Sequence, residues 1–446
     1  MWKVYGAIRI LAVCLLTIFV IAGCNLNDLT SSESTAKQDK TEVGFPQGAK
    51  WKPTEFVIST LVGIPGGGNE AQNDRSVKYH KEAYFNNIEL CDFSNDAMKL
   101  ALETCQKYDV SAMPFDPVFR DKFASEEDIK ERLKFYAPFA DTIRGFFIYD
   151  EPKYKSDIFE KIKENADWVR KYAPTKLMFI NLLPSYGEYT WSSDTGNWQD
   201  SKYARYTDDF FKATDPDVLS LDYYIFFSSE VCEADLVVNN LWRDIGYFRM
   251  KSIESGKPFW CYIQSLGEFV HNKAIGNMTA ERIALQVNSI VAYGAKGVSY
   301  YNSLCSLIDQ RAYKTVLFED IKSINQKAMT FGNFLLDKKY DKLYHTSVLS
   351  KIEKHYFTDS LEQSELISLL PENVLVSTFK DDSARTYLMV VNRDYTYPMD
   401  GDIVLKGKKK VGVLDPESGE QKVISGATDR IQLSLKAGDA ALYIIE

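Results

Sequence analysis

Short apolar runs alternate with longer amphipathic segments over most of this 446-residue chain. The runs have the length and β-rich composition of buried strands, and the segments between them have helical periodicity. Strands that alternate with helices predict βαβ units, and eight such units predict a closed (β/α)₈ barrel, also called a TIM barrel. The eight predicted strands span residues 56–62, 87–92, 110–114, 145–149, 176–181, 218–223, 259–264 and 297–301.

The clearest helical patterns lie at residues 96–108, 126–139, 156–172, 280–293 and 318–334. A doubly wound open sheet is the alternative fold. The one Gly-rich stretch, residues 63–68, lacks the G-x-G-x-x-G spacing of a nucleotide site and carries a proline where free amides would be needed. No cofactor is therefore predicted, and the barrel is the favoured fold class.

The pattern changes after about residue 343. Short strands broken by turn clusters follow one another without helices, at residues 374–379, 386–391, 401–405, 410–414, 431–435 and 440–445. This pattern is typical of a small all-β domain, most often a sandwich. We therefore expect a barrel over residues 51–343 and a C-terminal β-sandwich-like domain over 344–446 that braces it.

The N-terminal segment has the character of a targeting signal. Lys3 and Arg9 precede an apolar run over residues 10–22, which is shorter than the ~20 residues of a transmembrane helix. The run ends in Ile-Ala-Gly-Cys24, which resembles the lipobox of bacterial lipoproteins. We expect a signal peptide over 1–23, lipid on Cys24, a flexible polar tether over 24–50, and attachment to a membrane of the bacterial cell envelope.

Composition narrows the classes of partner. A hydrophobic content of 45% and a charged content of 26% are those of a globular protein. The net charge of −9 argues against nucleic acid, whose phosphates require a basic surface. The cysteines form no C-x-x-C pair and the four histidines have no ligand spacing, so no metal site is predicted.

Polar residues gather where the predicted strands end. In a parallel barrel these ends meet at one mouth, where active sites are built. Each residue alone could cap a helix or terminate a strand, but together they predict a substrate-binding ring. Its members are Asp92, Asp116, Asn181, Asp222, Tyr223, Tyr224, Gln264, Tyr301 and Asn302.

Two carboxyl groups can cleave a glycosidic bond, one as a proton donor and one at the anomeric carbon. Glu151 follows the fourth strand and Glu268 follows the seventh, so they can face each other across the mouth. Asp150 could support the acid or act as an acid itself. Three other acids could take the place of Glu268: Asp222, Glu230 and Glu233.

The loop after the fifth strand is rich in aromatic residues, among them Tyr186, Trp191 and Trp198. Exposed rings in such a loop would suit stacking on sugars, which makes these three residues candidate substrate contacts. The alternative is a loop that packs its rings beneath itself.

Four segments together resemble bacterial (β/α)₈ glycoside hydrolases of the retaining clan, of the lipoprotein type found in polysaccharide utilisation systems. The segments are GFFIYDEP at 145–152, DVLSLDYY at 217–224, PFWCYIQS at 258–265 and GAKGVSYYN at 294–302. The resemblance implies polysaccharide or oligosaccharide hydrolysis with Glu151 as acid/base and Glu268 as nucleophile. This chain departs from the clan at Asp150, where the clan has Asn, and at Tyr300 and Tyr301, where it usually has Trp.

Three hypotheses follow. The first is a two-carboxylate glycosidase with a carbohydrate substrate. The second is substrate-assisted hydrolysis, in which Asp150 positions an acetamido group and Glu151 is the only acid. The third is a surface lipoprotein that binds glycans without cleaving them, built on a degenerate barrel.

Overall fold

The computed structural model describes residues 39–65, 68–91, 93–191, 195, 197–226, 234–270, 273–275, 278–346 and 357–446, and the side chains of these ranges except 234–240, 268–270 and 273–275. Cys24, Asp92, Glu230 and Glu233 lie outside the described residues. Within the described part no helix has the length and apolarity needed to cross a bilayer.

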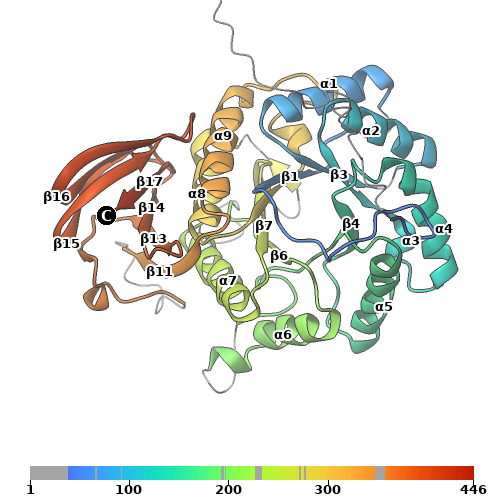
Figure 1. Ribbon diagram of the computed structural model, residues 1–446, viewed down its shortest axis with the longest axis horizontal. Helices are drawn as coiled ribbons and strands as arrows, with labels where there is room; N and C mark the ends of the chain where they lie inside the picture. The colour runs from blue at the N-terminus through green and yellow to red at the C-terminus, as the bar shows by residue number, and fades with distance from the viewer. Residues whose placement is uncertain are drawn as a thin grey trace, which may run out of the picture. The chain divides into compact units, whose positions relative to one another are not determined.

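Eight parallel strands close into a barrel with helices around it (Figure 1). Six strands form a sheet in the order β3-β2-β1-β10-β7-β6, and β4 pairs with β5. Parallel bridges between Ala112 and Ile143 and between Leu182 and Leu221 connect the β4–β5 pair to both edges of that sheet. The strands are β1 Val57–Leu61, β2 Asn87–Cys91, β3 Ser111–Phe115, β4 Gly145–Asp150, β5 Leu177–Asn181, β6 Leu219–Asp222, β7 Phe259–Gln264 and β10 Gly297–Tyr301.

All eight barrel strands coincide with the sequence predictions to within a residue or two, and the barrel prediction is confirmed. The reason is that the strands are buried on both faces and are therefore mostly apolar, so each stands out from the amphipathic segments around it. The helices are α1 Glu70–Glu82, α2 Asn95–Lys107, α3 Pro117–Arg120, α4 Glu126–Tyr136, α5 Ser156–Tyr172, α6 Lys202–Thr214, α7 Ala234–Ser255, α8 Ala280–Ala292 and α9 Phe318–Phe334. Short 3₁₀ turns lie at Ala137–Phe139, Trp198–Asp200, Ser303–Cys305 and Leu361–Gln363.

Aromatic side chains fill the interior of the barrel. Phe147 packs between Phe115 and Phe179, whose ring centroids lie 4.4 and 5.0 Å from its own. Trp260 lies below them, against Gly297, where an added Cβ would come within 2.7 Å of the indole. The barrel is therefore a packed core, and ligands are confined to its two ends.

The C-terminal residues form one antiparallel sheet that covers its own core. Its strands are β11 Lys339–His345, β12 Ile367–Leu369, β13 Val374–Lys380, β14 Thr386–Asn392, β15 Met399–Leu414, β16 Gln421–Leu435 and β17 Ala440–Ile445. Register shifts along β15 let this long strand pair with β12, β16 and β17, and apolar side chains of β13–β17 meet in one buried cluster. The all-β prediction is thus confirmed, with the first strand beginning slightly before the expected boundary.

The sheet also packs on the barrel, as expected for a brace. The Ser377 hydroxyl donates to the Ala292 carbonyl at 2.5 Å, and the Asn288 amide donates to the Gly438 carbonyl at 2.9 Å. Met389 and Leu442 belong to the same buried cluster as the helices α8 and α9. These contacts attach the sheet to the side of the barrel.

The last part of the expected tether differs from the prediction. Residues 39–50 lie along the base of the barrel, the end at which the strands begin. Val43 and Phe45 are buried, the Thr41 hydroxyl donates to the Tyr172 carbonyl, and the Phe45 ring contacts the Phe146 ring edge-on at 5.8 Å. This part of the segment is therefore attached to the barrel by two buried apolar side chains and by a hydrogen bond to the end of α5.

Candidate active site

Three carboxyl groups meet at the mouth of the barrel. Asp150 ends β4, Glu151 follows it directly, and Asp222 ends β6. Asn181 at the end of β5 lies between them, and its amide donates to Asp150 Oδ1 at 3.2 Å and to Asp222 Oδ1 at 3.3 Å. The Ser220 hydroxyl donates to the side-chain oxygen Oδ1 of Asn181 at 2.9 Å, and this hydrogen bond fixes the orientation of the Asn181 side-chain amide. We call Asp150, Glu151 and Asp222 the carboxyl cluster.

Glu151 is held in an unusual backbone conformation. Its φ is +48°, in the left-handed region that non-glycine residues seldom adopt, and its amide donates to the Asn181 carbonyl at 2.9 Å. Such strain persists only where surrounding contacts enforce it, and it is frequent at active sites. Here it turns Glu151 outward at the strand end, and Glu151 is exposed while Asp222 beneath it is 3% exposed.

The carboxyl cluster favours protonated forms. Burial, followed by the charges of Glu151 and Asp150, raises the pKa of Asp222 well above its ordinary value, and Asp222 is hydrogen bonded to Glu151. Burial also raises the pKa of Glu151, and the hydrogen bond from Asp222 opposes that shift. Two carboxyl groups can share a hydrogen bond only if one carries a proton, so the contact between Glu151 and Asp222 favours a proton shared by the pair.

Asp150 titrates near neutrality. Burial, followed by the charge of Glu151, raises the pKa of Asp150 to about 7. The hydrogen bond from Asn181 and the charge of Arg120 oppose the shift, whereas the charge of Glu89 adds to it. An acid that can both hold and release a proton near pH 7 is suited to general acid or base catalysis.

Two residues near the carboxyl cluster, Glu89 and Arg120, were not predicted from the sequence. Glu89 lies inside the barrel, 1% exposed, where it accepts hydrogen bonds from Ser59 and Ser299 at 2.7 Å and from Tyr262 at 2.5 Å. Arg120, at the end of α3, lies over the Phe115 ring at 4.5 Å and favours ionised Asp150. Glu89 could have been found from the sequence, because an acid in the middle of a mostly apolar strand is unusual. Nothing in the sequence indicates that Arg120 lies near β4.

Tyrosines surround the carboxyl cluster. The Tyr224 ring lies 5.2 Å from the Tyr301 ring, and the charges of Asp150 and Asp222 contribute to the raised pKa of both residues after burial. Tyr186 is 40% exposed, and its hydroxyl accepts the Tyr224 amide at 3.1 Å. Tyr223 is buried beneath Tyr186, with its ring edge-on at 4.9 Å. Exposed tyrosine faces beside carboxyl groups can contact a sugar ring.

Other members of the expected ring are occupied by protein contacts. Asp116 caps α3 by accepting the Val118 amide at 2.9 Å, and it also accepts hydrogen bonds from Arg132 and Tyr136. The Gln264 side chain is fully hydrogen bonded to the backbone. Its oxygen accepts the Phe226 amide, and its nitrogen donates to the carbonyls of Phe226 and Gly267. The structure therefore gives these two side chains structural contacts in place of the expected substrate contacts.

Asn302 lies at the end of β10 in a left-handed conformation, with φ of +61°. Its amide donates to the Leu61 carbonyl at 3.0 Å, which links the ends of β10 and β1. Its side-chain carbonyl oxygen is buried without a hydrogen-bond partner among the described residues. Its role as a substrate contact therefore stays a prediction.

The aromatic loop packs mostly under itself, as in the alternative considered from the sequence. The Trp191 ring lies 5.1 Å from Tyr203 and 5.2 Å from Tyr247, and its indole N–H donates to Asp244 at 2.7 Å. The Trp198 ring packs edge-on against Phe357 at 4.9 Å. Among the three loop residues proposed as sugar contacts, only Tyr186 lies beside the carboxyl cluster.

Glu268 lies in the short strand β8 Glu268–Val270, which pairs with β9 Lys273–Ile275 in an antiparallel hairpin beyond β7. Its side chain is outside the described positions, so its pairing with Glu151 stays a prediction. Within the described residues no group of three or more histidine, cysteine or acidic side chains has the arrangement of a metal site.

Comparison with solved structures places the fold among barrel glycosidases. A glycoside hydrolase family 5 protein from Bacteroides vulgatus is similar with a TM-score of 0.52 at 13% identity, covering 87% of this chain and 89% of that one. A family 51 arabinofuranosidase from Xanthomonas axonopodis is similar with a TM-score of 0.50 at 10% identity, covering 90% and 97%. No protein-family model and no curated protein sequence matches the chain. The chain thus shares with these solved glycosidases a (β/α)₈ barrel followed by a β domain, the fold that the resemblance of the four segments implies.

Proposed function

We propose that this protein is a glycoside hydrolase that cleaves a polysaccharide or oligosaccharide, with Glu151 as the general acid/base. The observation that carries the proposal is the carboxyl cluster at the mouth of the barrel. The Asn181 side-chain amide bridges Asp150 and Asp222, and Glu151 is hydrogen bonded to Asp222. Carboxyl groups with strongly raised pKa values are concentrated at active sites, where a proton must be held for chemistry.

Glu151 is the member best placed to reach a glycosidic oxygen, because it alone is exposed. Asp222 lies beneath it and, through their hydrogen bond, is a positioning residue that keeps a proton available. The two carboxyl groups are in contact, which leaves no room for the water that an inverting enzyme holds between its acids at ~6.5–9.5 Å. We therefore take Asp222 as a partner of the acid and propose Asp150 or Glu268 as the second catalytic carboxylate, with Glu230 and Glu233 as the remaining alternatives.

The test is a hydrolysis screen of purified protein on plant, fungal and host polysaccharides, repeated with Glu151→Gln. A general acid is needed less when the leaving group is already acidic. Glu151→Gln should therefore lose activity on the natural glycan while keeping most of its activity on a dinitrophenyl glycoside of the same sugar. A wild-type chain that binds a glycan without cleaving any substrate would contradict the enzyme proposal and favour a glycan-binding protein.

We also propose that Cys24 carries a lipid that attaches the protein to the bacterial envelope, on the strength of the apolar run and the lipobox-like Ile-Ala-Gly-Cys24. Metabolic labelling with a palmitate analogue should mark the wild-type chain, whereas Cys24→Ser should be unlabelled and leave the membrane fraction. A labelled Cys24→Ser chain would contradict the proposal.

A further inference from the structure

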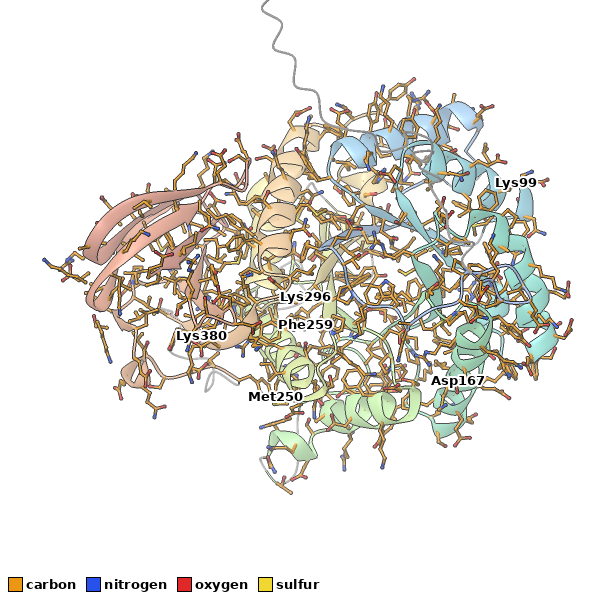
Figure 2. The ribbon with its side chains drawn as sticks, in the orientation of Figure 1. Lys99, Asp167, Met250, Phe259, Lys296 and Lys380 are labelled. Carbon is orange, nitrogen blue, oxygen red and sulfur yellow. The ribbon has the colours of Figure 1, made fainter. Side chains whose placement is uncertain are left out.

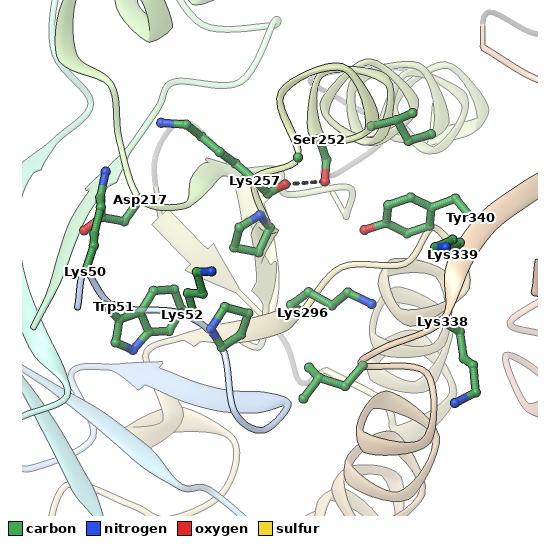
Figure 3. A pocket seen from close by; sticks show the side chains of 15 residues that line it. Lys50, Trp51, Lys52, Asp217, Ser252, Lys257, Lys296, Lys338, Lys339 and Tyr340 are labelled. Carbon is green, nitrogen blue, oxygen red and sulfur yellow. Dashed lines mark hydrogen bonds and ion pairs between the residues drawn. The ribbon is translucent and has the colours of Figure 1, made fainter. Parts of the chain in front are cut away.

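An open cavity of about 610 Å³ lies at the base of the barrel, at the opposite end from the carboxyl cluster (Figure 3). Its lining includes Pro258 and Lys296, which precede β7 and β10, so the cavity lies beside the beginnings of these strands. Trp51 stands on one side of it and Tyr340 on the other, with Lys52 and Lys296 between them. Trp51 also contacts Trp260 of the barrel interior, with the two rings edge-on at 6.3 Å.

The lining is strongly basic in a chain whose net charge is −9. Asp217 is the one acid of the lining. The six lysines of the lining are Lys50, Lys52, Lys257, Lys296, Lys338 and Lys339. Positive charges collected around a cavity repel one another, and they attract an anion.

Four of these lysines have acids as ion-pair partners: Lys50 with Asp217, Lys257 with Asp215, Lys338 with Asp337, and Lys339 with Asp382. No ion pair among the described residues involves the other two, Lys52 and Lys296. The unbalanced positive charge of the cavity therefore belongs to these two side chains.

Lys296 is the more unusual of the two because it is only 8% exposed. Its ammonium group donates to the Leu335 carbonyl at 2.8 Å, where α9 ends, and lies 5.4 Å from the centre of the Tyr340 ring. Burial lowers the pKa of Lys296 to about 8; Asp337 opposes the shift and Lys338 adds to it. Capping of α9 explains one of three N–H donors, and a bound anion would occupy the others and restore the ordinary pKa.

We propose that this cavity binds a phosphate-bearing organic ligand, with Lys52 and Lys296 at the phosphoryl oxygens and Trp51 and Tyr340 against the organic part. Lysine ammonium groups bind phosphate as compact charges. Two lysines without an acidic partner match the nearly double negative charge of a phosphate monoester at neutral pH better than the single charge of a carboxylate. The volume is that of a small-molecule site and exceeds the needs of inorganic phosphate alone.

Two sources of such a ligand differ in where the site would act. The described chain runs along the barrel base from Thr41 to Trp51 before it enters β1, so a membrane anchor upstream would bring this face towards the lipid. If the proposed anchor at Cys24 holds, the phosphate can be an anionic lipid headgroup. A soluble sugar phosphate is the other source, and it needs no anchor.

The experiment uses the unlipidated chain from Asn25 to Glu446, which retains the whole packed unit Asp39–Glu446. Calorimetry would measure binding of glucose 6-phosphate and glycerol 3-phosphate. Co-sedimentation would measure binding to phosphatidylcholine vesicles with and without phosphatidylglycerol. The test variant is Lys52→Ser/Lys296→Met. The charge-matched control is Lys99→Ser/Lys202→Met, in which Lys99 lies on α2 at the outside of the barrel and away from Lys296 (Figure 2).

We expect saturable binding of one ligand per chain, weakened about tenfold or more in the test variant and unchanged in the control. Binding of the soluble phosphates alone assigns the site to a soluble ligand, and phosphatidylglycerol-dependent sedimentation that the test variant loses assigns it to the membrane. Absence of both kinds of binding, or an equal loss in the control, overturns the proposal. Lys52→Ser alone, at an exposed position, gives the same answer should the double variant fail to fold. None of these measurements depends on glycosidase activity.

Discussion

Asp116 and the carboxyl cluster lie at the same end of the barrel but have opposite surroundings. At the end of β3, Asp116 meets a cation, a hydroxyl and a backbone amide, so its carboxylate is fully compensated. At the ends of β4 and β6, Asp150, Glu151 and Asp222 meet mainly one another. The first arrangement stabilises the fold, whereas the second raises its free energy, and this difference separates structural acids from catalytic candidates.

The largest expected effect is on activity. Replacing Glu151 with Gln keeps the size of the side chain and removes its proton-donating acid, so kcat on the natural glycan should fall by about 10²–10⁴-fold. Asp116→Asn is the matched control, since it changes an acid at the same end of the barrel without touching the carboxyl cluster. Equal losses of kcat in the two folded variants would show that Asp116 matters as much to the reaction as Glu151, and would contradict the assignment of Asp116 to a structural role.

The second prediction concerns the compensated acid. Asp116→Ala leaves the Arg132 guanidinium and the start of α3 without their partner, and it should lower the free energy of unfolding by about 3–5 kcal/mol. Denaturant unfolding at pH 7 measures the loss. A variant as stable as the wild type would show that Arg132 finds sufficient compensation in Asn95, which accepts from it at 2.6 Å.

The third prediction is a gain in the free energy of unfolding, at Asp150. The pKa of Asp150 is about 7 in the folded chain and near its ordinary value when unfolded, so its contribution to stability is fully present below about pH 4 and is lost as pH rises through 7. Asp150→Asn should therefore be more stable than the wild type at pH 8, by about 1–3 kcal/mol, and the gain should vanish near pH 4. The Asn side chain can still accept the hydrogen bond from Asn181. A gain independent of pH would assign the effect to packing.

The fold was largely predictable from sequence because its signals are local. The barrel strands are short, mostly apolar segments, and α5 Ser156–Tyr172 and α9 Phe318–Phe334 match their periodic patterns end to end. The contacts between strand ends were less predictable. In the sequence, Asp116 and Asp222 look alike, because each follows a predicted strand. Only the folded structure shows that Asp116 contacts Arg132 and that Asp222 contacts Glu151. Glu89 likewise gains its three hydroxyl partners from strands distant in sequence.

The smallest predicted effect concerns an aromatic side chain, Trp191, and tests whether its role is structural or in substrate binding. Trp191 was expected to contact substrate, but its indole donates to the buried Asp244, which also accepts the amide and hydroxyl of Ser185. Trp191→Phe keeps most of the ring packing and removes one hydrogen bond to a charged group, so stability should fall by about 1–2 kcal/mol while KM for the glycan stays unchanged. Tyr186→Phe, beside the carboxyl cluster, is the comparison. A raised KM in Trp191→Phe with an unchanged melting temperature and an unchanged KM in Tyr186→Phe would contradict this assignment and favour contact of the indole with substrate.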